Sequence, residues 1–237
     1  MIGGAADKAL FPAMAKVRDD GERLRAAYVR SASLIALVTM PSSMILFVLA
    51  PEIVQLLLGP RWQAVVLPLQ VFALVLLPRA SYRISGSLTR ATGAVYGGAW
   101  RQWMYAAEVL AACVVGSRWG VNGVAVGASI AICLHFLVML RFSARVAAGL
   151  MGDVLRMYLK HLPVALAALV AAQTVATLAR RFGAPSVLTI GVTTVGWALA
   201  TTLVVMLMRR AYREELDIVL RVVQSRRAAT GSTDTSS

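Results

Sequence analysis

The sequence predicts an all-α membrane protein, a polytopic helix bundle with about six transmembrane helices. Of its 237 residues, 59% are apolar and 15% are charged, whereas a soluble domain is typically about half apolar and a quarter charged. The mean hydropathy of +0.72 agrees with this excess. The apolar residues are also gathered into runs of the length that crosses a bilayer, roughly 20 residues. A soluble globular enzyme does not have this composition.

The first 30 residues are predicted to form a partial helix followed by a charged cytoplasmic link. Residues 1–14 are too short to span a membrane and carry Asp7 and Lys8. Residues 13–30 are rich in charge, and we expect them to be a helical link with a break between Asp20 and Gly21.

Six apolar runs follow and together predict a membrane domain over residues 31–208. The second run becomes rich in Arg and Ser after Leu77, and the third contains Glu108. The links between the runs hold Gly, Pro and Arg, as is typical of turns at membrane surfaces. The predicted spans are 31–59, 64–88, 102–117, 121–140, 162–178 and 186–208.

Three segments outside these spans are also predicted. In 150–162, Asp153, Arg156 and Lys160 share one helical face, which indicates a helix that lies in the membrane interface. After the last span, 209–227 is predicted to be a cytoplasmic amphipathic helix. The small polar residues of 228–237 predict a disordered tail.

The positions of the cations predict the orientation of the chain. Alternate sides of the predicted membrane domain carry 20 and 4 of the 24 Lys and Arg residues. Lys and Arg gather on the cytoplasmic side of membrane proteins, so both termini are predicted to be cytoplasmic. Because the net charge of +13 follows this topology, no nucleic-acid partner is expected.

The second run carries the strongest candidates for ligand binding. Arg79, Arg83 and Arg90 are spaced so that they fall within about 40° of each other on an α-helix. Cations within a span are costly and usually face a protein interior or a water-filled cavity. Three in line therefore suit a phosphate-bearing or otherwise anionic substrate. The alternative is that the side chains reach toward the cytoplasmic headgroups, and for Arg90 we favour that alternative.

Glu108 is an acid well inside an apolar run. An intramembrane carboxyl can carry a proton in coupled transport. The alternative is a structural carboxylate paired with an arginine of a neighbouring span, such as Arg79, and we weigh pairing above coupling.

Prolines and glycines predict local helix geometry. Pro41 interrupts the first run, and Pro68 and Pro78 interrupt the second. Proline bends a helix, so transporter hinges and static kinks are both compatible with these positions. Gly123 and Gly127 form a GxxxG pattern, which favours close helix packing, here within the same chain.

No enzyme signature is present in the sequence. It contains no GxSxG, HExxH or Walker motif, and His135 and His161 are too isolated to form a metal pair. We therefore expect no enzymatic activity, no metal and no cofactor.

Several short motifs over about residues 5–145 occur in an order typical of one family. They are Leu10-Phe11-Pro12-Ala13, a charged link ending near Tyr28, Pro41, Ala50-Pro51-Glu52, Leu58-Gly59 before Trp62, Arg90-Ala91-Thr92-Gly93 and Gly120-Val121-Asn122-Gly123. Together they resemble the C-terminal half of bacterial polysaccharide-biosynthesis flippases, which belong to the multidrug/oligosaccharidyl-lipid/polysaccharide exporter superfamily.

The resemblance implies a transporter that turns a polyprenyl-diphosphate-linked oligosaccharide from the inner to the outer leaflet of the bacterial plasma (inner) membrane. It implies two lobes around a cationic cavity, driven by an ion gradient, and this chain has the length of one lobe. An N-terminal lobe or a second copy is therefore expected as a partner, besides membrane lipids and a polysaccharide polymerase or glycosyltransferases. Arg79 and Arg83 suit the diphosphate, although no position matches a diagnostic site motif.

Two other functions stay open at the level of sequence. One is a multidrug or small-molecule exporter of the same fold, which drug resistance without an effect on cell-surface polysaccharide would favour. The other is a non-transporting membrane scaffold for polysaccharide-assembly enzymes. Retained assembly after neutralisation of Arg79, Arg83 and Glu108 would favour the scaffold.

Overall fold

The computed structural model describes residues 20–91, 95–146, 149–213 and 215. Within these ranges the chain is helical apart from short turns and contains no strand, which confirms the all-α class. The elements are α2 (Gly21–Leu57), η1 (Pro60–Val65), α3 (Val66–Leu74), α4 (Leu76–Ala91), α5 (Val95–Gly116), η2 (Ser117–Trp119), α6 (Gly120–Val146), α7 (Leu150–Arg181) and α8 (Ser186–Leu207).

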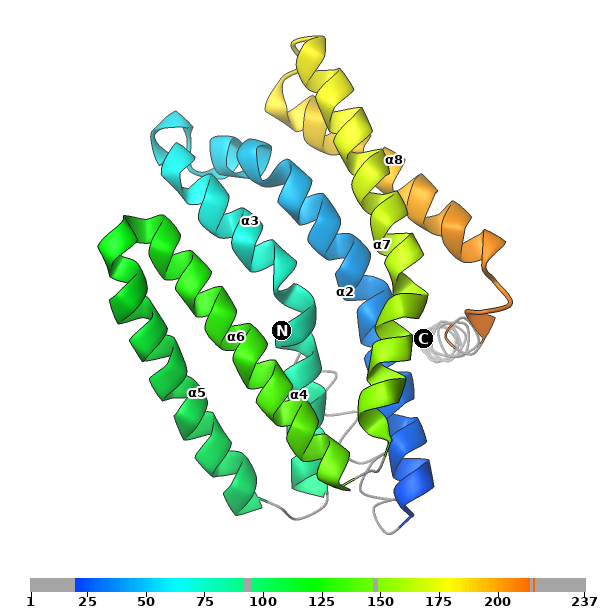
Figure 1. Ribbon diagram of the computed structural model, residues 1–237. Coiled ribbons are helices and arrows are strands. Elements are labelled where there is room, and N and C mark those ends of the chain that lie inside the picture. The colour runs from blue at the N-terminus through cyan, green and yellow to red at the C-terminus, as the bar shows by residue number, and fades with distance from the viewer. Residues whose placement is uncertain (1–19, 92–94, 147–148, 214, 216–237) are drawn as a thin grey trace, which may run out of the picture.

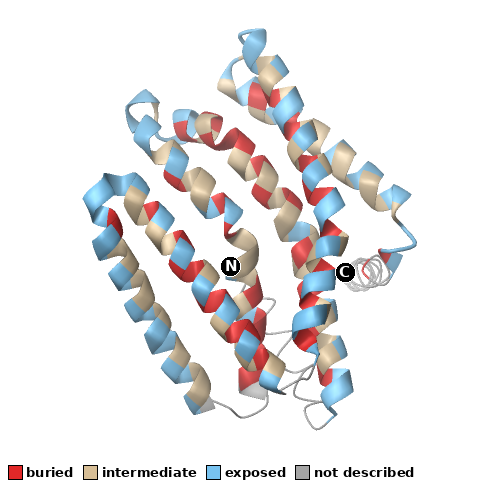
Figure 2. Cartoon of the chain, viewed as in Figure 1, coloured by how far each residue is buried: buried red, intermediate tan, exposed pale blue. Residues whose placement is uncertain are grey.

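The helices pack side by side around α2 (Figure 1). On one side of α2 lie α7 and then α8, and on the other side lie α3 with α4, then α6, then α5. Buried residues gather along α2, α7 and the inner parts of α4 and α6, whereas α5 and α8 at the two ends have few (Figure 2). The helices at the ends of the row therefore present most of their apolar side chains outward, as expected of a surface in contact with lipid.

Four helical segments are long and apolar enough to cross a membrane, and a fifth is formed if the bent pair Pro60–Leu74 and Leu76–Thr89 is one span. One of the four, Tyr96–Arg145, contains both α5 and α6. The two helices fold back on each other in an antiparallel hairpin (Figure 1). These segments make the chain a multi-pass membrane protein. The count of six crossings, with α5 and α6 crossing separately, stays a prediction.

The hairpin of α5 and α6 depends on small residues. A Cβ added at Gly127 would lie 2.6 Å from the carbonyl oxygen of Ala112, and one added at Gly116 would lie 2.7 Å from the carbonyl carbon of Gly123. Side chains at these positions would push the two backbones apart. The GxxxG pattern therefore packs within the chain, as predicted.

Two segments predicted to lie outside the spans are instead the first turns of long helices. Residues 21–30 begin α2, with Asp20 accepting a hydrogen bond from the Arg23 backbone N–H at 3.0 Å. Residues 150–162 are continuous with the following span in α7, which runs through Pro163. At 37 and 32 residues, the two helices are about 55 and 48 Å long, well beyond the roughly 30 Å of hydrocarbon.

The N-terminal ends of α2 and α7 are held together by packing and by an ion pair. Leu24 and Leu150 are both 1% exposed or less and belong to the main core cluster. The Arg25 Nε donates to Asp153 Oδ2 at 2.5 Å. Residues 150–162 therefore pack against α2 as the first part of α7. Their position in the membrane interface stays a prediction.

The second predicted span bends by 45° between α3 and α4. Pro78 has no N–H to offer the carbonyl of Leu74, so the helical ladder is interrupted there. The neighbouring carbonyl of Ala73 accepts a hydrogen bond from the Ser43 hydroxyl of α2 at 2.5 Å. Pro68 lies in the first turn of α3, where an N–H is not needed, and α2 continues through Pro41.

At the opposite end from Arg25, α2 and α7 are joined by a second ion pair. The Arg180 guanidinium donates to both oxygens of Glu52, at 2.6 and 2.9 Å, and to the Val48 carbonyl at 2.9 Å. The side chain of Glu52 is only 8% exposed. Neither the pairing nor its geometry was evident from the sequence, in which the two residues are 128 positions apart.

The chain after α8 returns to the faces of α2 and α7. Glu215 accepts hydrogen bonds at 2.6 Å from both the Ser33 hydroxyl of α2 and the Lys160 ammonium of α7. The Tyr212 hydroxyl donates to the Lys160 carbonyl at 2.7 Å. Burial raises the pKa of Tyr212 to about 12. The predicted helix 209–227 and the tail 228–237 lie almost entirely outside the described residues.

The Glu52–Arg180 pair is expected to contribute to stability. Glu52→Gln or Arg180→Gln should each lower the free energy of unfolding by about 2 kcal/mol, because each removes hydrogen bonds to a charged group and leaves the other partner short of a buried bond. Circular dichroism in detergent measures the change. Arg181→Gln is the matched control and should stay within about 0.5 kcal/mol; an equal effect at both arginines would contradict a specific pair.

The attachment of the C-terminal segment should depend on pH. Burial disfavours the Glu215 carboxylate, but the hydrogen bonds from Lys160 and Ser33 outweigh it and hold the pKa below the ordinary 4.5. Stability from this group is present above that ordinary value and is lost as the pH falls through the lower native pKa. Protease cleavage after Arg213 should therefore accelerate below about pH 4.5, and in Glu215→Gln it should lose that pH dependence. Unchanged pH dependence in the variant would contradict this role.

Candidate functional site

Helix α4 has a packed face made of small hydroxyl-bearing side chains. The Tyr158 hydroxyl of α7 donates to Ser81 Oγ at 2.9 Å. Tyr28 of α2 and Ser85 share a hydrogen bond of 2.8 Å between their hydroxyls. Ser81 and Ser85 are 2% exposed or less. Their small volume allows α4 to lie close to α2, and the tyrosine partners satisfy the serine hydroxyls.

The other face of α4 carries Arg79 and Arg83, two of the three arginines that the sequence pattern indicated as candidates for ligand binding. Arg79 and Arg83 are one helical turn apart and both are exposed. Among the described residues, neither guanidinium has an ion pair or a side-chain hydrogen bond. Arg90 belongs to α4 as well, but its side chain lies outside what the structure describes. The predicted stripe is therefore present for its two deeper members.

An aromatic cluster from three helices lies beside this face. Tyr82 of α4, Tyr105 of α5 and His135 of α6 have ring centroids 4.4 to 5.7 Å apart. His135 is 1% exposed. The sequence did not indicate that the two tyrosines lie beside His135. The positions are too far apart along the chain for spacing to show the cluster.

Glu108 lies one turn beyond Tyr105 on α5. Its Oε2 atom is buried and has no hydrogen-bond partner among the described residues. The expected ion pair between Glu108 and Arg79 is absent from the part of the chain that the structure describes. Both groups lie within electrostatic range of the Tyr105 side chain, and among the described residues they do not pair directly. Proton coupling at Glu108 stays a prediction.

These groups together can bind an anion and present a titratable carboxyl beside it. Two exposed guanidiniums on one helix face offer the forked N–H donors that match phosphate oxygens. The rings of Tyr82 and Tyr105 offer flat surfaces next to the cations. We call Arg79, Arg83, Tyr82, Tyr105, Glu108 and His135 the α4 site. Within the described ranges, no group of three or more His, Cys, Asp or Glu side chains could hold a metal ion.

The lack of a partner for Glu108 has a measurable consequence. Glu108→Gln should leave the free energy of unfolding unchanged or raise it slightly, because no charge-assisted bond is lost and a charge leaves an apolar span. Thermal unfolding in detergent, followed by circular dichroism, measures this. Glu52→Gln is the matched control because its carboxylate is paired. If Glu108→Gln lowered the free energy of unfolding as much as Glu52→Gln, Glu108 would have a stabilising partner, which would contradict the prediction.

Part of the chain is similar to known polysaccharide-biosynthesis proteins of the membrane. A family model described as "Polysaccharide biosynthesis protein" matches residues 1–67. The chain is 33% identical over 88 residues to the lipopolysaccharide biosynthesis protein WzxC of Escherichia coli K12, covering 37% of this chain and 18% of that protein. It is 32% identical over 84 residues to an uncharacterized membrane protein in the cps region of Klebsiella pneumoniae, covering 35% and 17%.

These matches cover only part of each protein. The chain spans less than a fifth of the length of either relative, and no solved structure matches it. The family model ends at residue 67, before α4 begins, whereas the motifs of the sequence extend the resemblance to about residue 145. Over its N-terminal part, the chain's resemblance to bacterial polysaccharide-biosynthesis membrane proteins is confirmed.

Proposed function

We propose that this chain is part of a transporter that moves a polyprenyl-diphosphate-linked oligosaccharide across the bacterial inner membrane for surface-polysaccharide biosynthesis. The names of the relatives support a role in polysaccharide biosynthesis, since one is a lipopolysaccharide biosynthesis protein and the other is an uncharacterized membrane protein in a cps region. Both termini would be cytoplasmic, as the distribution of Lys and Arg favours.

The observation that carries the proposal is the pair of exposed guanidiniums on α4 that form no ion pair or hydrogen bond with the residues that the structure describes. An arginine within a span is costly to expose to lipid and is normally found facing a cavity or a partner. Other charged side chains pair within the chain, as Glu52 does with Arg180. Among the described residues, Arg79 and Arg83 have no such pair. A diphosphate carries the charge and the oxygen geometry that would satisfy both arginines.

The position of the arginines also suits a transport cycle. Arg79 lies four residues after Val75, where α3 and α4 meet at 45°. A change in this bend, at a helix already interrupted by Pro78, would move both guanidiniums together with α4. Glu108, whose Oε2 has no hydrogen-bond partner among the described residues, would be the group that takes up and releases a proton. Its electrostatic influence on Tyr105 would couple it to Arg79.

The proposed transporter would also need a second lobe. We propose that the face bearing Arg79 and Arg83 borders a cavity closed by a second lobe, either an N-terminal lobe or a second copy. A polysaccharide polymerase or glycosyltransferases would supply or consume the transported glycan. No catalytic step is assigned to this chain.

The proposal is tested by neutralising the α4 arginines in the gene at its natural locus. Arg79→Ala and Arg83→Ala should each reduce surface polysaccharide at least tenfold, because each removes a charge-assisted contact worth about 1.5–3 kcal/mol. Membrane abundance, measured by immunoblot, should be unchanged. Polysaccharide is quantified on whole cells with a glycan-specific antibody or lectin.

Arg61→Ala is the control for that experiment. Arg61 is also exposed, but it lies in η1, away from the α4 site, and its removal should leave surface polysaccharide unchanged. Normal polysaccharide in Arg79→Ala would contradict the proposal. Altered drug tolerance with normal polysaccharide would point instead to a small-molecule exporter.

A further inference from the structure

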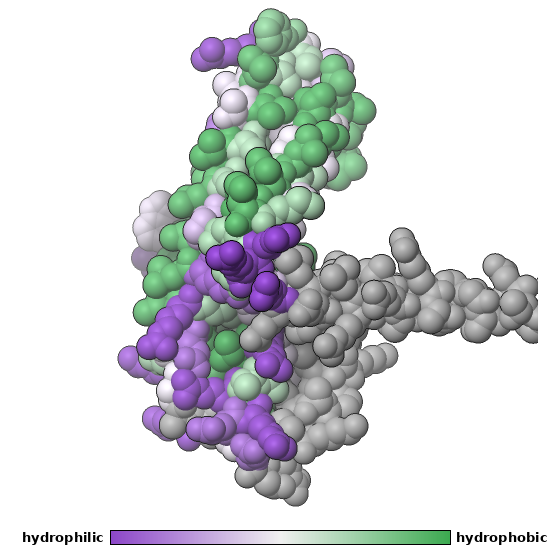
Figure 3. All heavy atoms as spheres, turned by 90° about the vertical axis from the view of Figure 1, so that its right-hand side faces the viewer, coloured by the Kyte–Doolittle hydropathy of each residue, from purple (hydrophilic) through white to green (hydrophobic). Residues whose placement is uncertain are grey.

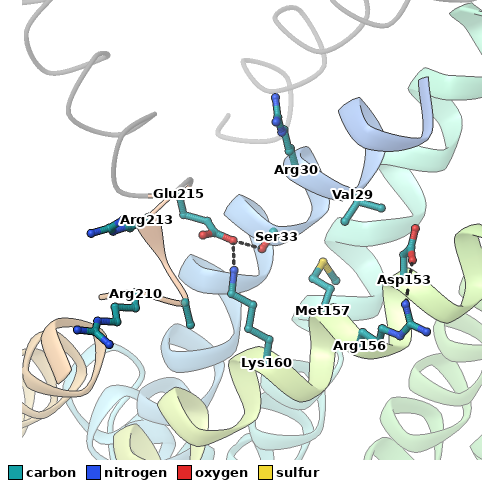
Figure 4. A pocket seen from close by; sticks show the side chains of 11 residues that line it. Val29, Arg30, Ser33, Asp153, Arg156, Met157, Lys160, Arg210, Arg213 and Glu215 are labelled. Carbon is teal, nitrogen blue, oxygen red and sulfur yellow. Dashed lines mark hydrogen bonds and ion pairs between the residues drawn. The ribbon is translucent and has the colours of Figure 1, made fainter. Parts of the chain in front are cut away.

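A second cationic site lies on the opposite side of α2 from α4. It is a pocket of about 610 Å³ between the N-terminal halves of α2 and α7 and the segment that follows α8 (Figure 4). Its cationic lining residues are Arg30, Arg156, Lys160, Arg210 and Arg213. No residue of α3, α4, α5 or α6 lines it, so it is separate from the α4 site.

The pocket keeps an excess of positive charge after its internal pairs are formed. Only two carboxylates, Asp153 and Glu215, line it beside the five cations. Glu215 is 2.6 Å from Lys160, and Asp153 pairs with Arg25 outside the pocket and more loosely, at 3.9 Å, with Arg156. Arg210 and Arg213 have no ion pair or side-chain hydrogen bond to another described residue. Without counting Arg30, the described residues that line the pocket therefore include four cations and two carboxylates, an excess of two positive groups.

The pocket lies at the level where the surface of the bundle changes from apolar to charged. Helix α8 ends at Leu207, and arginines occupy positions 209, 210 and 213. In the N-terminal part of α7 the charged positions end at Lys160, and the apolar stretch 162–178 follows before Arg180. The space-filling view shows this boundary as hydrophilic residues directly below a broad hydrophobic surface (Figure 3). Both helices thus place the pocket at the depth of lipid headgroups, at the end that the cation distribution assigns to the cytoplasm.

The packing explains why Arg210 and Arg213 lie beside the pocket. Glu215 and Tyr212 fix the segment after α8 against Ser33 and Lys160. This attachment pairs the carboxylate of Glu215 with the ammonium of Lys160. It brings Arg210 and Arg213 to the rim of the pocket, opposite Arg156 of α7 (Figure 4).

We propose that this pocket binds the phosphate of an anionic phospholipid headgroup. Basic pockets between transmembrane helices on the cytoplasmic side are suited to phosphate-bearing headgroups, and arginines provide the forked donors that match phosphate oxygens. The adjoining apolar surfaces of α7 and α8 receive the acyl chains. The inference depends on the membrane placement of the chain and not on what it transports.

The test is lipid binding by the full chain in neutral detergent. Native mass spectrometry counts bound phosphatidylglycerol, with phosphatidylcholine as the zwitterionic lipid of matched chain length. The double variant Arg210→Gln/Arg213→Gln should bind phosphatidylglycerol about 30-fold more weakly than the original chain, because each cation near a lipid surface contributes a factor of about five. Binding of phosphatidylcholine should not change.

A second double variant separates this pocket from general surface charge. Arg118 and Arg181 are exposed arginines that do not line the pocket, so Arg118→Gln/Arg181→Gln should retain phosphatidylglycerol binding. Circular dichroism verifies that both variants keep their helical content. Equal losses in the two double variants would overturn the proposal.

A competition experiment distinguishes a lipid headgroup from a free anion. Inorganic phosphate at millimolar concentration should not displace phosphatidylglycerol, because it gains nothing from the apolar surfaces beside the pocket. Displacement of the lipid by an equal concentration of inorganic phosphate would overturn the assignment to a lipid and make the pocket a soluble-anion site.

Discussion

Every polar side chain within an apolar helix bundle needs a partner, either another protein group or water, and this requirement organises the described structure. Each helix satisfies its own backbone hydrogen bonds. The polar side chains that join the helices are hydrogen-bonded to one another in pairs. Ser85 meets Tyr28, and Ser81 meets Tyr158. Glu52 and Arg180 bind each other through two hydrogen bonds. Because α2 takes part in most of these contacts, it forms the centre of the row of helices.

The same requirement draws attention to charged groups that have no ion pair within the described part of the chain. Arg79 and Arg83 point away from the packed face of α4, and the carboxyl of Glu108 is not engaged by either of them. A structural role would have used these charges in pairs of the Glu52–Arg180 kind. Their arrangement beside the rings of Tyr82 and Tyr105 is the physical basis for proposing a diphosphate ligand.

Much of the fold could be predicted from composition and periodicity, because the bilayer imposes a length and an apolar pattern on each helix. The shared face of Arg79 and Arg83 on α4 could be predicted because the two residues are four positions apart. The continuity of 150–162 with the following span was missed, because burial of Leu150 and Val154 depends on α2, which is remote in sequence. The partner of Glu52 and the Tyr82–Tyr105–His135 cluster were missed for the same reason, since contacts between helices leave no local pattern. Pro78 marked a real break, whereas Pro68, in the first turn of α3, did not.

The central claim is that the face of α4 bearing Arg79 is open to water rather than to lipid. It is tested most directly by labelling single cysteines in membranes with a charged, membrane-impermeant maleimide, after Cys113 and Cys133 have been replaced by alanine. Arg79→Cys should be labelled readily. Val195→Cys, which is 60% exposed in the native chain on the apolar surface of α8, should not be. Equal protection of the two positions would place the arginine face against lipid and contradict the claim.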